Sequence, residues 1–517
     1  MIRLESYVLD SWQPGTGTPR TLLNPATEEP LAETSSEGID FESVLNHARV
    51  VGGPNLRALG FSGRAALLKA MSRTLYAQRE HLLDIAMANG GNTRKDAKFD
   101  VDGATATLAY YASLGKNLGE TNLLQDAESE QLTQSPRFHG LHVWSPREGA
   151  AVHINAFNFP AWGTFEKAAV ALLAGMPIIT KPATSSAWLA YEMVKIVIDE
   201  GILPAGALQL ICGSTGDLLD HLGPQDVLAF TGSADTGATL RGTQGPVSAS
   251  SRINVEADSL NSAVLGPDAE RGSEIYLAAV RNIVTEMTQK AGQKCTAIRR
   301  ILVPEALLEA VEEDVAAELD TYTIGNPTEP GVRMGPLATA GQLRDYRAGV
   351  ATLAQEASIV YGSATEVSPV GVPENTGFFA GPVLLKVEDT QSAVAVHALE
   401  VFGPVATILP YDGSASEAAE LLARGAGSLA ASVYSSDKTF LRELLPAMGP
   451  HHGRILVIDK KVADTATGHG MVLPQVVHGG PGRAGGGEEL GGLRGLRFYM
   501  QRTGFQGNKA LLDRLLS

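Results

Sequence analysis

The chain has 517 residues, a length that corresponds to about three domains at roughly 150 residues per domain. Hydrophobic residues make up 44% of it and charged residues 19%, which is typical of a folded globular protein and not of a disordered one. The 41 Lys and Arg residues against 57 Asp and Glu residues give a formal net charge of −16, which disfavours contact with nucleic acids and anionic membranes. A peptide and a disulfide-stapled mini-protein are excluded, and we expect no nucleic-acid or membrane partner.

The cysteine count and the N-terminus indicate the compartment. Only Cys212 and Cys295 are present, too few for a disulfide framework in a chain of this size. The first residues, MIRLESYVLDSW, lack the basic start and apolar core of a signal peptide. The longest strongly apolar stretch, 168–180, is too short to span a bilayer and contains Gly175 and Pro177. We therefore expect a soluble cytoplasmic protein.

The first predicted elements in the chain are helices, followed by an alternation of strands and helices. Apolar residues recur at spacings of three and four between residues 64 and 118, which predicts a layer of amphipathic helices. From residue 150 to residue 242, short apolar runs alternate with helical ones in the order β-α-β-α-β-α-β-α. This order predicts a parallel sheet with helices on its faces and a ligand site at the carboxyl ends of its strands.

A second series of alternating elements follows, so the predicted fold class is α/β with two parallel-sheet units. Its predicted helices cover 273–289, 304–320 and 415–424, and its predicted strands cover 297–303, 383–387, 402–409 and 454–459. Nine glycines between Gly479 and Gly495 are too dense for regular structure and predict a close-packed loop.

Several common catalytic motifs are absent or fail in context. Residues 480–485 match G-x-G-x-x-G, but no convincing strand precedes them and no periodic helix follows, so we discount the match. Neither a P-loop nor a G-x-S-x-G nucleophile elbow occurs. His451 and His452 are adjacent, and neither cysteine has a second Cys or His close by, so we predict no metal site.

Three residues are candidates for chemistry, and each has a structural alternative. Cys295 lies in a predicted helix-to-strand loop beside Lys294, although most lone cysteines are small buried hydrophobes, the interpretation we favour for Cys212. Glu256 follows the strand-like run at 253–255 and is either a reactive carboxylate or a solvated strand end. Asn158 follows the first strand of the parallel unit, where its amide can donate to an oxyanion.

Six motifs occur in an order that resembles the aldehyde dehydrogenase superfamily. They are FNFPAWG (157–163), ITKPAT (179–184), FTGSADTG (230–237), NVEA (254–257), GQKC (292–295) and EVFGP (400–404). The resemblance covers nearly the whole chain. It implies an NAD(P)-dependent aldehyde dehydrogenase with a Rossmann-type cofactor domain, a catalytic domain and a small β oligomerisation flap.

The resemblance also implies roles for the candidate residues. Cys295 resembles the nucleophile, which forms a thiohemiacetal and then a thioester, with the oxyanion held by its own backbone amide and by Asn158. Glu256 resembles the general base that activates the hydrolytic water. Glu400 and Phe402 resemble the pair that contacts the ribose and positions the nicotinamide, and Glu489 is a possible proton relay.

The cofactor predicted from the resemblance is NADP, with NAD less favoured. Lys181 resembles the lysine that contacts the adenosine ribose, and Thr184 stands where NAD-preferring members often carry a carboxylate. A carboxylate repels a 2′-phosphate by on the order of 4 kcal/mol at 4 Å, whereas Thr donates a hydrogen bond. Alternatively, Thr184 caps a helix starting at Ser185 or Ser186.

Further cofactor contacts are predicted in two loops. Gly213, Ser214 and Thr215 follow the next strand and offer donors to the same phosphate. Gly232 and Ser233 open a helix and resemble the pyrophosphate turn of the family.

Two departures from the family pattern concern the predicted base. Residues Ala257, Asp258 and Ser259 replace the glycines that commonly follow it, and the interval between Glu256 and Cys295 is a few residues longer than expected.

The tail at 478–507 is closer to members that oxidise CoA-linked semialdehydes from aromatic ring cleavage. A CoA-acylating dehydrogenase is the alternative function, and a catalytically silent member is the alternative from another class. Glu256 argues against acyl transfer to CoA, which needs no water-activating carboxylate.

The predicted domain organisation follows the same resemblance. Residues 1–130 and 150–254 are assigned to the NADP-binding domain and 255–480 to the catalytic domain. Residues 131–149 and 494–517 are assigned to oligomerisation in a homodimer or a dimer of dimers. Alternation in Phe138, Gly140, His142 and Trp144 suits an exposed strand that awaits a partner.

Overall fold

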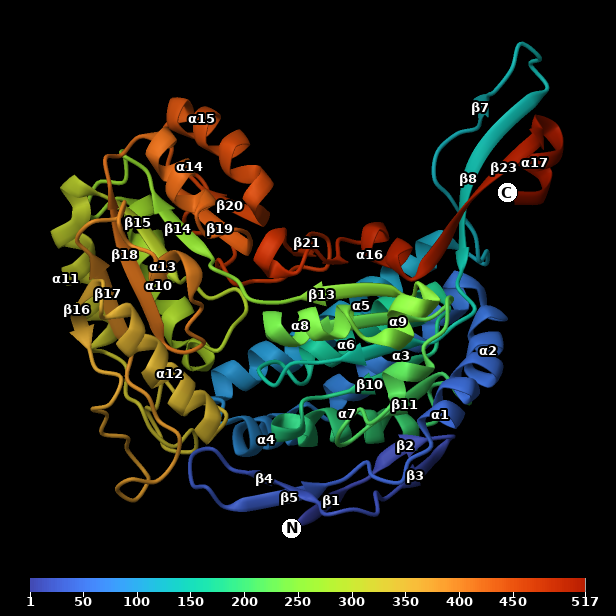
Figure 1. Ribbon diagram of the computed structural model, residues 1–517, viewed down its shortest axis with the longest axis horizontal. Coiled ribbons are helices and arrows are strands. Elements are labelled where there is room, and N and C mark those ends of the chain that lie inside the picture. Colours follow the sequence, from blue (N-terminus) through green and yellow to red (C-terminus); the bar gives the residue numbers. More distant parts are fainter. Residues whose placement is uncertain (517) are drawn as a thin grey trace.

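The computed structural model describes residues 1–516 and contains two large sheets and a projecting arm (Figure 1). The first large sheet has the strand order β13-β12-β9-β10-β11-β2-β3. Its five central strands pair in parallel, and the N-terminal strands extend it in antiparallel fashion. The strands are β2 (Ser6–Val8), β3 (Ser11–Gln13), β9 (Ala151–Ile154), β10 (Ile178–Lys181), β11 (Leu208–Leu210), β12 (Val227–Thr231) and β13 (Arg252–Glu256).

Helices cover both faces of this sheet, and three of them confirm the helical layer predicted for residues 64–118. The helices are α1 (Phe41–His47), α2 (Gly53–Arg57), α3 (Gly60–Ala77), α4 (Arg79–Gly90), α5 (Arg94–Leu118), α6 (Trp162–Ala174), α7 (Ala187–Asp199), α8 (Ala234–Arg241) and α9 (Gln244–Ala249). Helix α5 begins after Thr93, whose side chain accepts from the Asp96 amide. The buried carboxylate of Asp100 in α5 accepts from the amides of Ala161 and Trp162 and so fixes the start of α6.

The second large sheet has the order β16-β17-β18-β15-β14-β19-β20 and is parallel except for the edge strand β16. Its strands are β14 (Ser262–Leu265), β15 (Arg300–Pro304), β16 (Ala357–Gly362), β17 (Val383–Val387), β18 (Val405–Tyr411), β19 (Ser428–Tyr434) and β20 (His452–Ile458). Its helices are α10 (Glu274–Thr288), α11 (Leu308–Leu319), α12 (Ala340–Leu353), α13 (Ala395–Ala398), α14 (Ala415–Ala423) and α15 (Lys438–Met448).

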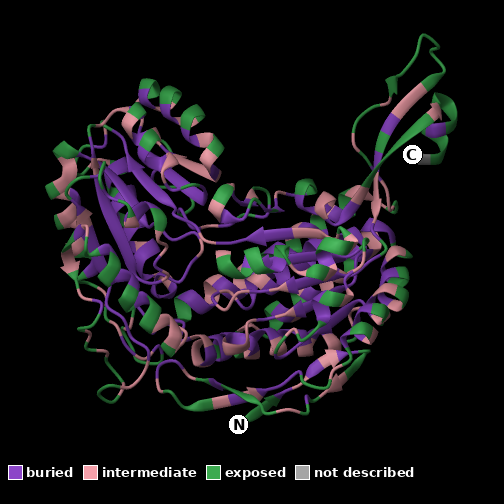
Figure 2. Cartoon of the chain, in the orientation of Figure 1, coloured by how far each residue is buried: buried purple, intermediate pink, exposed green. Residues whose placement is uncertain are grey.

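The two parallel sheets confirm the predicted α/β class. The sheets themselves are the most buried part of each unit, as Figure 2 shows. The first sheet extends to Glu256, two residues beyond the boundary expected at 254. No described helix is long and apolar enough to cross a membrane.

The arm projects from the body and is built from segments far apart in the sequence (Figure 1). Strand β8 (Phe138–Pro146) pairs antiparallel along its whole length with β23 (Met500–Asn508). Short strands β6 (Leu124–Gln125) and β7 (Glu130–Gln131) also pair with β8, and α17 (Lys509–Leu516) packs against it. The predicted oligomerisation segments 131–149 and 494–517 run through this arm, except for Ser517, which lies outside the described residues.

Two smaller pieces complete the fold. Near the N-terminus, β1 (Ile2–Leu4), β4 (Arg20–Leu23) and β5 (Pro30–Thr34) form a three-stranded sheet. The glycine-rich tail contains β21 (Val477–Gly479), β22 (Glu488–Leu490) and α16 (Leu493–Phe498). The discounted G-x-G-x-x-G segment lies in this tail and contains only a single 3₁₀ turn at Gly482–Ala484.

Candidate active site

Two hollows meet at Cys295. A cleft of about 1380 Å³ lies beyond the carboxyl ends of β9, β12 and β13, and a pocket of about 490 Å³ lies on the other side of the thiol. Asn158, Thr231, Glu256 and Cys295 line both hollows. The site therefore lies where a parallel α/β sheet commonly places its ligand.

The loop that carries Cys295 has an unusual backbone. Lys290 and Ala291 have φ angles of 53° and 51°, and Gly292 has a φ of 67°, so three successive residues are left-handed. A Cβ atom on Gly292 would lie 2.2 Å from the Gly403 carbonyl oxygen, so only glycine fits there. Asn261 donates its side-chain amide to the Cys295 carbonyl at 2.8 Å and holds the end of the loop.

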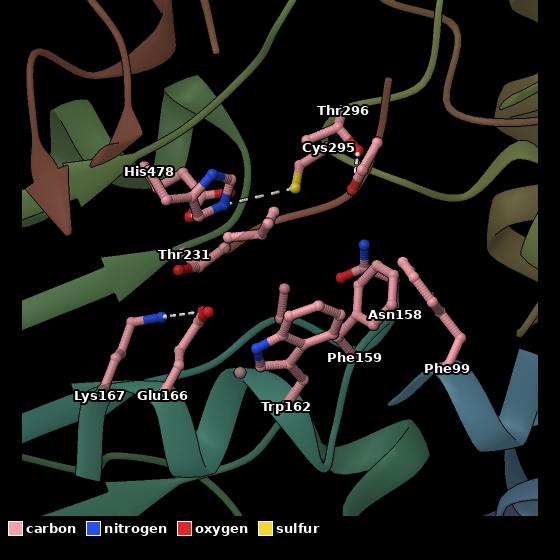
Figure 3. Close-up of a pocket in the computed structure, with 15 residues that line it drawn as sticks. Phe99, Asn158, Phe159, Trp162, Glu166, Lys167, Thr231, Cys295, Thr296 and His478 are labelled. Atoms are coloured by element: carbon pink, nitrogen blue, oxygen red, sulfur yellow. Dashed lines mark hydrogen bonds and ion pairs between the residues drawn. The ribbon is translucent and has the colours of Figure 1, made fainter. Parts of the chain in front are cut away.

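A histidine lies beside the thiol of Cys295 (Figure 3), and it also lies close to the Glu256 carboxylate. His478 Nε2 is 3.1 Å from Glu256 Oε2 and 3.9 Å from Cys295 Sγ. On the other side of the ring, Arg454 donates to His478 Nδ1 at 3.2 Å. Glu256 is 2% exposed, so the carboxylate is held away from bulk water.

The pKa values of Glu256, Cys295 and His478 indicate which of these groups carries a charge at rest. Burial alone would raise the pKa of Glu256, but His478 and Lys167 hold it down at about 2. Burial and the neighbouring Glu256 charge raise the pKa of the Cys295 thiol well above its usual range. Burial lowers the pKa of His478, while Glu256 outweighs it and the net direction is upward. Glu256 is thus ionised and the thiol protonated at rest.

Asn158 lies next to the thiol, as the resemblance implies. Its Nδ2 donates to the Gln293 carbonyl at 3.0 Å, which aligns the amide alongside the cysteine loop. An amide nitrogen carries two hydrogens, so one remains for an oxyanion formed at Cys295.

Glu489 contacts the catalytic region through a second buried charge cluster. Its Oε1 accepts from Asn254 on β13 at 3.0 Å, and its Oε2 is 3.3 Å from Lys167 Nζ. The same ammonium is 3.5 Å from Glu166 Oε1. Carboxylate oxygens of Glu166, Glu256 and Glu489 lie within 4.8 Å of one another. Burial raises the pKa of Glu166 to about 7 despite Lys167, and also raises that of Glu489.

The predicted adenosine-end residues lie on β10 and the following loops. Lys181 ends β10, and burial, together with the nearby Arg20 guanidinium, lowers its pKa. Thr184 begins a 3₁₀ turn, Thr184–Ser186, and α7 follows from Ala187. No side-chain capping bond occurs at either helix start, so the interpretation of Thr184 as a helix cap is wrong. Because the 3₁₀ turn occupies Thr184–Ser186, the α-helix starts only at Ala187, and Thr184 does not stand at its N-terminus.

Gly213, Ser214 and Thr215 follow β11 in a loop held by the N-terminal segment. Ser36 donates its hydroxyl to the Ser214 carbonyl at 2.7 Å, and Thr34 donates to the Cys212 carbonyl at 2.8 Å. Cys212 itself is fully buried, and burial strongly raises the pKa of its thiol, in keeping with a structural role.

Gly232, Ser233, Glu400 and Phe402 all line the cleft. Ser233 caps α8, where Asp258 also accepts from the Ala234 amide at 3.0 Å. The Ser259 amide donates to Glu400 at 3.2 Å, and burial raises the pKa of Glu400 to about 7. The Phe402 ring meets Phe157 edge-on, with centroids 5.8 Å apart.

Sequence reasoning missed four charged or titratable residues of the site, namely Glu166, Lys167, Arg454 and His478. The pair Glu166 and Lys167 follows the FNFPAWG motif two residues later on α6, and two such residues inside an otherwise apolar helix were an available signal. His478 and Arg454 had no such signal, because strand pairing alone brings them to the thiol.

Fold and site together define an α/β enzyme with a thiol, a carboxylate and an amide at the junction of a cleft and a pocket. A sequence profile described as the aldehyde dehydrogenase family matches residues 12–503. The 3,4-dehydroadipyl-CoA semialdehyde dehydrogenase of Aromatoleum evansii is 47% identical over 480 residues, which cover 93% of each chain. The chain belongs to the aldehyde dehydrogenase family, and it is an NAD(P)-dependent oxidoreductase that acts on aldehydes.

Solved structures agree on the fold. A 3,6-anhydro-L-galactose dehydrogenase in complex with NADP superposes with a TM-score of 0.84 at 23% identity, over 98% of this chain and 100% of that one. A betaine aldehyde dehydrogenase of Staphylococcus aureus in complex with NAD⁺ gives 0.84 at 22% identity, over 98% of each chain. At this identity the likeness establishes the fold alone.

Proposed function

We propose that this enzyme oxidises its aldehyde to the carboxylic acid through a thioester on Cys295, with NADP as the hydride acceptor. The observation that carries the proposal is the convergence of Cys295, Glu256 and Asn158 where the cleft and the pocket meet. The Cys295 sulfur attacks the aldehyde carbon, and its backbone amide and Asn158 donate to the oxyanion. A nicotinamide bound in the cleft would supply the hydride acceptor. Glu256 then takes a proton from the water that cleaves the thioester.

Three buried residues give that proton a route away from Glu256. Lys167 Nζ lies between Glu489 and Glu166, at 3.3 and 3.5 Å from their carboxylate oxygens. With its pKa raised to about 7, Glu166 exchanges protons near neutral pH. We assign Glu489, Lys167 and Glu166 to proton release from the water-activating carboxylate.

The cleft fits a dinucleotide, and its adenosine end favours NADP. Lys181 is largely buried and has no carboxylate within ion-pairing distance among the described residues, so a phosphate would supply its missing counter-charge. Thr184 would add a neutral donor, and Gly213, Ser214 and Thr215 in the loop after β11 would offer further donors to that phosphate. Gly232 and Ser233 would hold the pyrophosphate, and Glu400 and Phe402 the nicotinamide ribose and ring.

The proposed substrate is a CoA-linked semialdehyde, 3,4-dehydroadipyl-CoA semialdehyde. The support is the 47% identity to the Aromatoleum evansii enzyme that carries this substrate in its name. The pocket behind Cys295 is lined by Phe99, Phe159, Trp162 and Val472, an apolar wall that suits a hydrocarbon chain. Acyl transfer to free CoA is the alternative, and the buried, ionised Glu256 disfavours it.

The proposed organisation keeps residues 1–130 and 150–254 as the cofactor domain, 255–480 as the catalytic domain, and the arm as the surface for a homodimer or dimer of dimers. Exposed Leu132, Phe138 and Phe505 on the arm support association, because apolar groups on a projecting strand pair favour a partner. Sedimentation equilibrium tests this association, and a monomer at micromolar concentration would contradict it.

The cytoplasm remains the proposed compartment, testable by cell fractionation.

The experiment compares NADP with NAD for the purified enzyme on an aldehyde panel that includes a CoA-thioester semialdehyde, with and without free CoA. We expect faster turnover with NADP, independent of added CoA. Thr184→Glu should lower kcat/KM for NADP by about a hundredfold or more, through repulsion of the 2′-phosphate, and change the NAD value little. Thr184→Ala, the matched control, should cost only a few-fold. Wild-type preference for NAD, or a requirement for free CoA, would contradict the proposal.

A further inference from the structure

His478 is a buried titratable group at the reaction centre to which the proposed chemistry gives no task. It lies on β21 and is 3% exposed. Its Nε2 faces both Glu256 and Cys295, at 3.1 and 3.9 Å, and Figure 3 shows the ring pointing at the sulfur. His478 Nε2 therefore lies within 4 Å of a reactive atom of both groups and is their shared neighbour.

The hydrogen on the His478 ring is located by its second partner. Arg454 contacts Nδ1 at 3.2 Å, and a guanidinium has only donors, so Nδ1 accepts. The ring hydrogen therefore lies on Nε2 and points at Glu256 and Cys295. Although Glu256, Cys295 and His478 have the atom types of a metal site, an Nε2 that carries hydrogen is not a ligand.

The backbone around His478 keeps the ring in place. Gly479 has a φ of 143°, and a Cβ on it would lie 2.0 Å from the Gly487 carbonyl oxygen. A Cβ on Gly453, beside Arg454, would lie 1.6 Å from the Gly479 carbonyl oxygen. These close approaches press β20, β21 and the glycine-rich tail together, so His478 and Arg454 have little freedom to move apart.

We infer that His478 is a further catalytic residue, a hydrogen-bond donor that Glu256 and Cys295 share during thiol activation. At rest the Nε2 hydrogen is donated to the Glu256 carboxylate and holds it beside the thiol. When the S–H bond of Cys295 breaks, its proton forms an O–H bond on Glu256, and the negative charge moves to the sulfur. His478 keeps its own hydrogen and redirects it to the thiolate. The inference deepens the proposed function and rests on its assignment of Cys295 and Glu256.

The charges that face His478 suit this task. They are Glu256 on β13, Glu166 on α6, Glu489 on β22, Arg454 on β20 and the thiol of Cys295. Because Glu256 is anionic, its charge opposes formation of a second anion at the sulfur. Transfer of the thiol proton to Glu256 removes that repulsion, and a donor already in place stabilises the new anion without rearrangement.

The test measures alkylation of Cys295 by iodoacetamide, with neither cofactor nor aldehyde present. His478→Phe keeps a ring but removes the donor, whereas His478→Gln keeps an N–H donor of similar reach. We expect the Phe variant to lower the rate constant at pH 8 on the order of tenfold or more and to move the pH midpoint upward. The Gln variant should stay within about threefold of wild type.

Two controls assign the signal. Cys295→Ala should remove the fast reaction, since Cys212 is fully buried. His469→Gln makes the same exchange at another buried histidine, which bonds Ser432 at 2.9 Å, and should leave the rate unchanged. NADP affinity reports the folding of each variant.

Three results would overturn the inference. They are a folded Phe variant that reacts at the wild-type rate, a Gln variant that falls as far as the Phe variant, and a wild-type thiol no more reactive than the Cys295→Ala background. Because the assay needs no turnover, a failure of the proposed aldehyde oxidation or NADP preference would show separately, as absent turnover with intact thiol reactivity.

Discussion

Glu256 stays ionised although Glu166 and Glu489 have carboxylate oxygens within 4.8 Å of its own. Carboxyl groups this close together in a buried site do not all ionise unless neighbouring groups stabilise their charges, and here that stabilisation is unequal. His478 and Lys167 stabilise the Glu256 charge, whereas burial raises the pKa of Glu166 to about 7. One carboxylate is thereby kept ready to accept a proton, and its neighbour is able to release one.

Glu256→Gln should lower steady-state turnover by about a hundredfold or more and should also slow the burst of reduced cofactor, because this carboxylate takes the thiol proton before it activates the water. Rapid mixing of enzyme, NADP and aldehyde measures the burst, and Cys295→Ala is the control that should show neither phase while it still binds NADP. A burst at the wild-type rate in Glu256→Gln would show that the thiol is activated without this carboxylate, and would contradict the role inferred for it beside His478.

Asn158, Glu256 and Cys295 could be predicted from the sequence, because each lies within a short, contiguous motif. His478 was beyond such reasoning. It approaches Glu256 only because β21 and β22 of the tail pack against β13 and β20, and this packing depends on glycine contacts from separate parts of the chain.

Among the elements, the glycine-rich tail sets the position of the strand that ends in Glu256. The Ala257 amide donates to the Ala484 carbonyl at 3.1 Å, and Asn254 accepts from the Glu488 amide at 3.0 Å. A Cβ on Gly485 would lie 2.2 Å from the Val255 carbonyl oxygen. The dense glycines were predicted to form a close-packed loop, and the structure shows that they pack against β13.

Gly485→Ala should therefore lower kcat by about tenfold or more, because the added methyl group displaces the backbone next to Glu256. Gly486→Ala is the matched control: its residue also has a positive φ, 67°, but nothing lies within 4 Å of an added Cβ. Both variants bear backbone strain, so a difference in kcat between them reports the contact with Val255. Equal kcat values would contradict this account.

Three strands of the second sheet, β14, β16 and β19, escaped the sequence analysis, and β14 and β19 did so for a clear physical reason. Every residue of both is buried, and β19 reads SLAASVY, with small residues on both faces. A strand covered on both sides has no alternation of polar and apolar residues, so its periodicity carries no signal. Strands β9 to β12 of the first sheet were predicted because their apolar runs alternate with clear helical periods, whereas the short β2 and β3 were not predicted.

For the molecule as a whole, several buried histidines should make stability depend on pH. Burial lowers the pKa of His153 and of His397 to about 3, and that of His452 to about 4. Above the unfolded pKa of about 6.5 the rings are neutral in both states and make no difference. Below it these histidines bind protons in the unfolded chain but not in the folded chain. Their contribution to stability therefore falls as pH drops from about 6.5 towards 4.

The expected slope is roughly 1.4 kcal/mol per pH unit for each such histidine. Urea unfolding midpoints at pH 7.5, 6.0 and 5.0 measure it. His153→Gln should reduce the slope, whereas His81→Gln, at an exposed position, should not. Glu166 and Glu400, with pKa values raised to about 7, oppose this slope, so the test is the difference between variants. Equal slopes for wild type and His153→Gln would contradict neutral burial of His153.

The arm has a consequence for how the protein is made. Strand β8 leaves the ribosome more than 350 residues before β23, the strand that pairs with its whole length. At about 5–20 residues per second, β8 waits roughly 20 to 70 seconds for that partner. During this interval the edge of β8 that pairs with β23 leaves its amides and carbonyls without that partner, which favours pairing with a wrong strand. The arm is thus completed only once β23 has been made, and association of copies through the complete arm has to wait for that step.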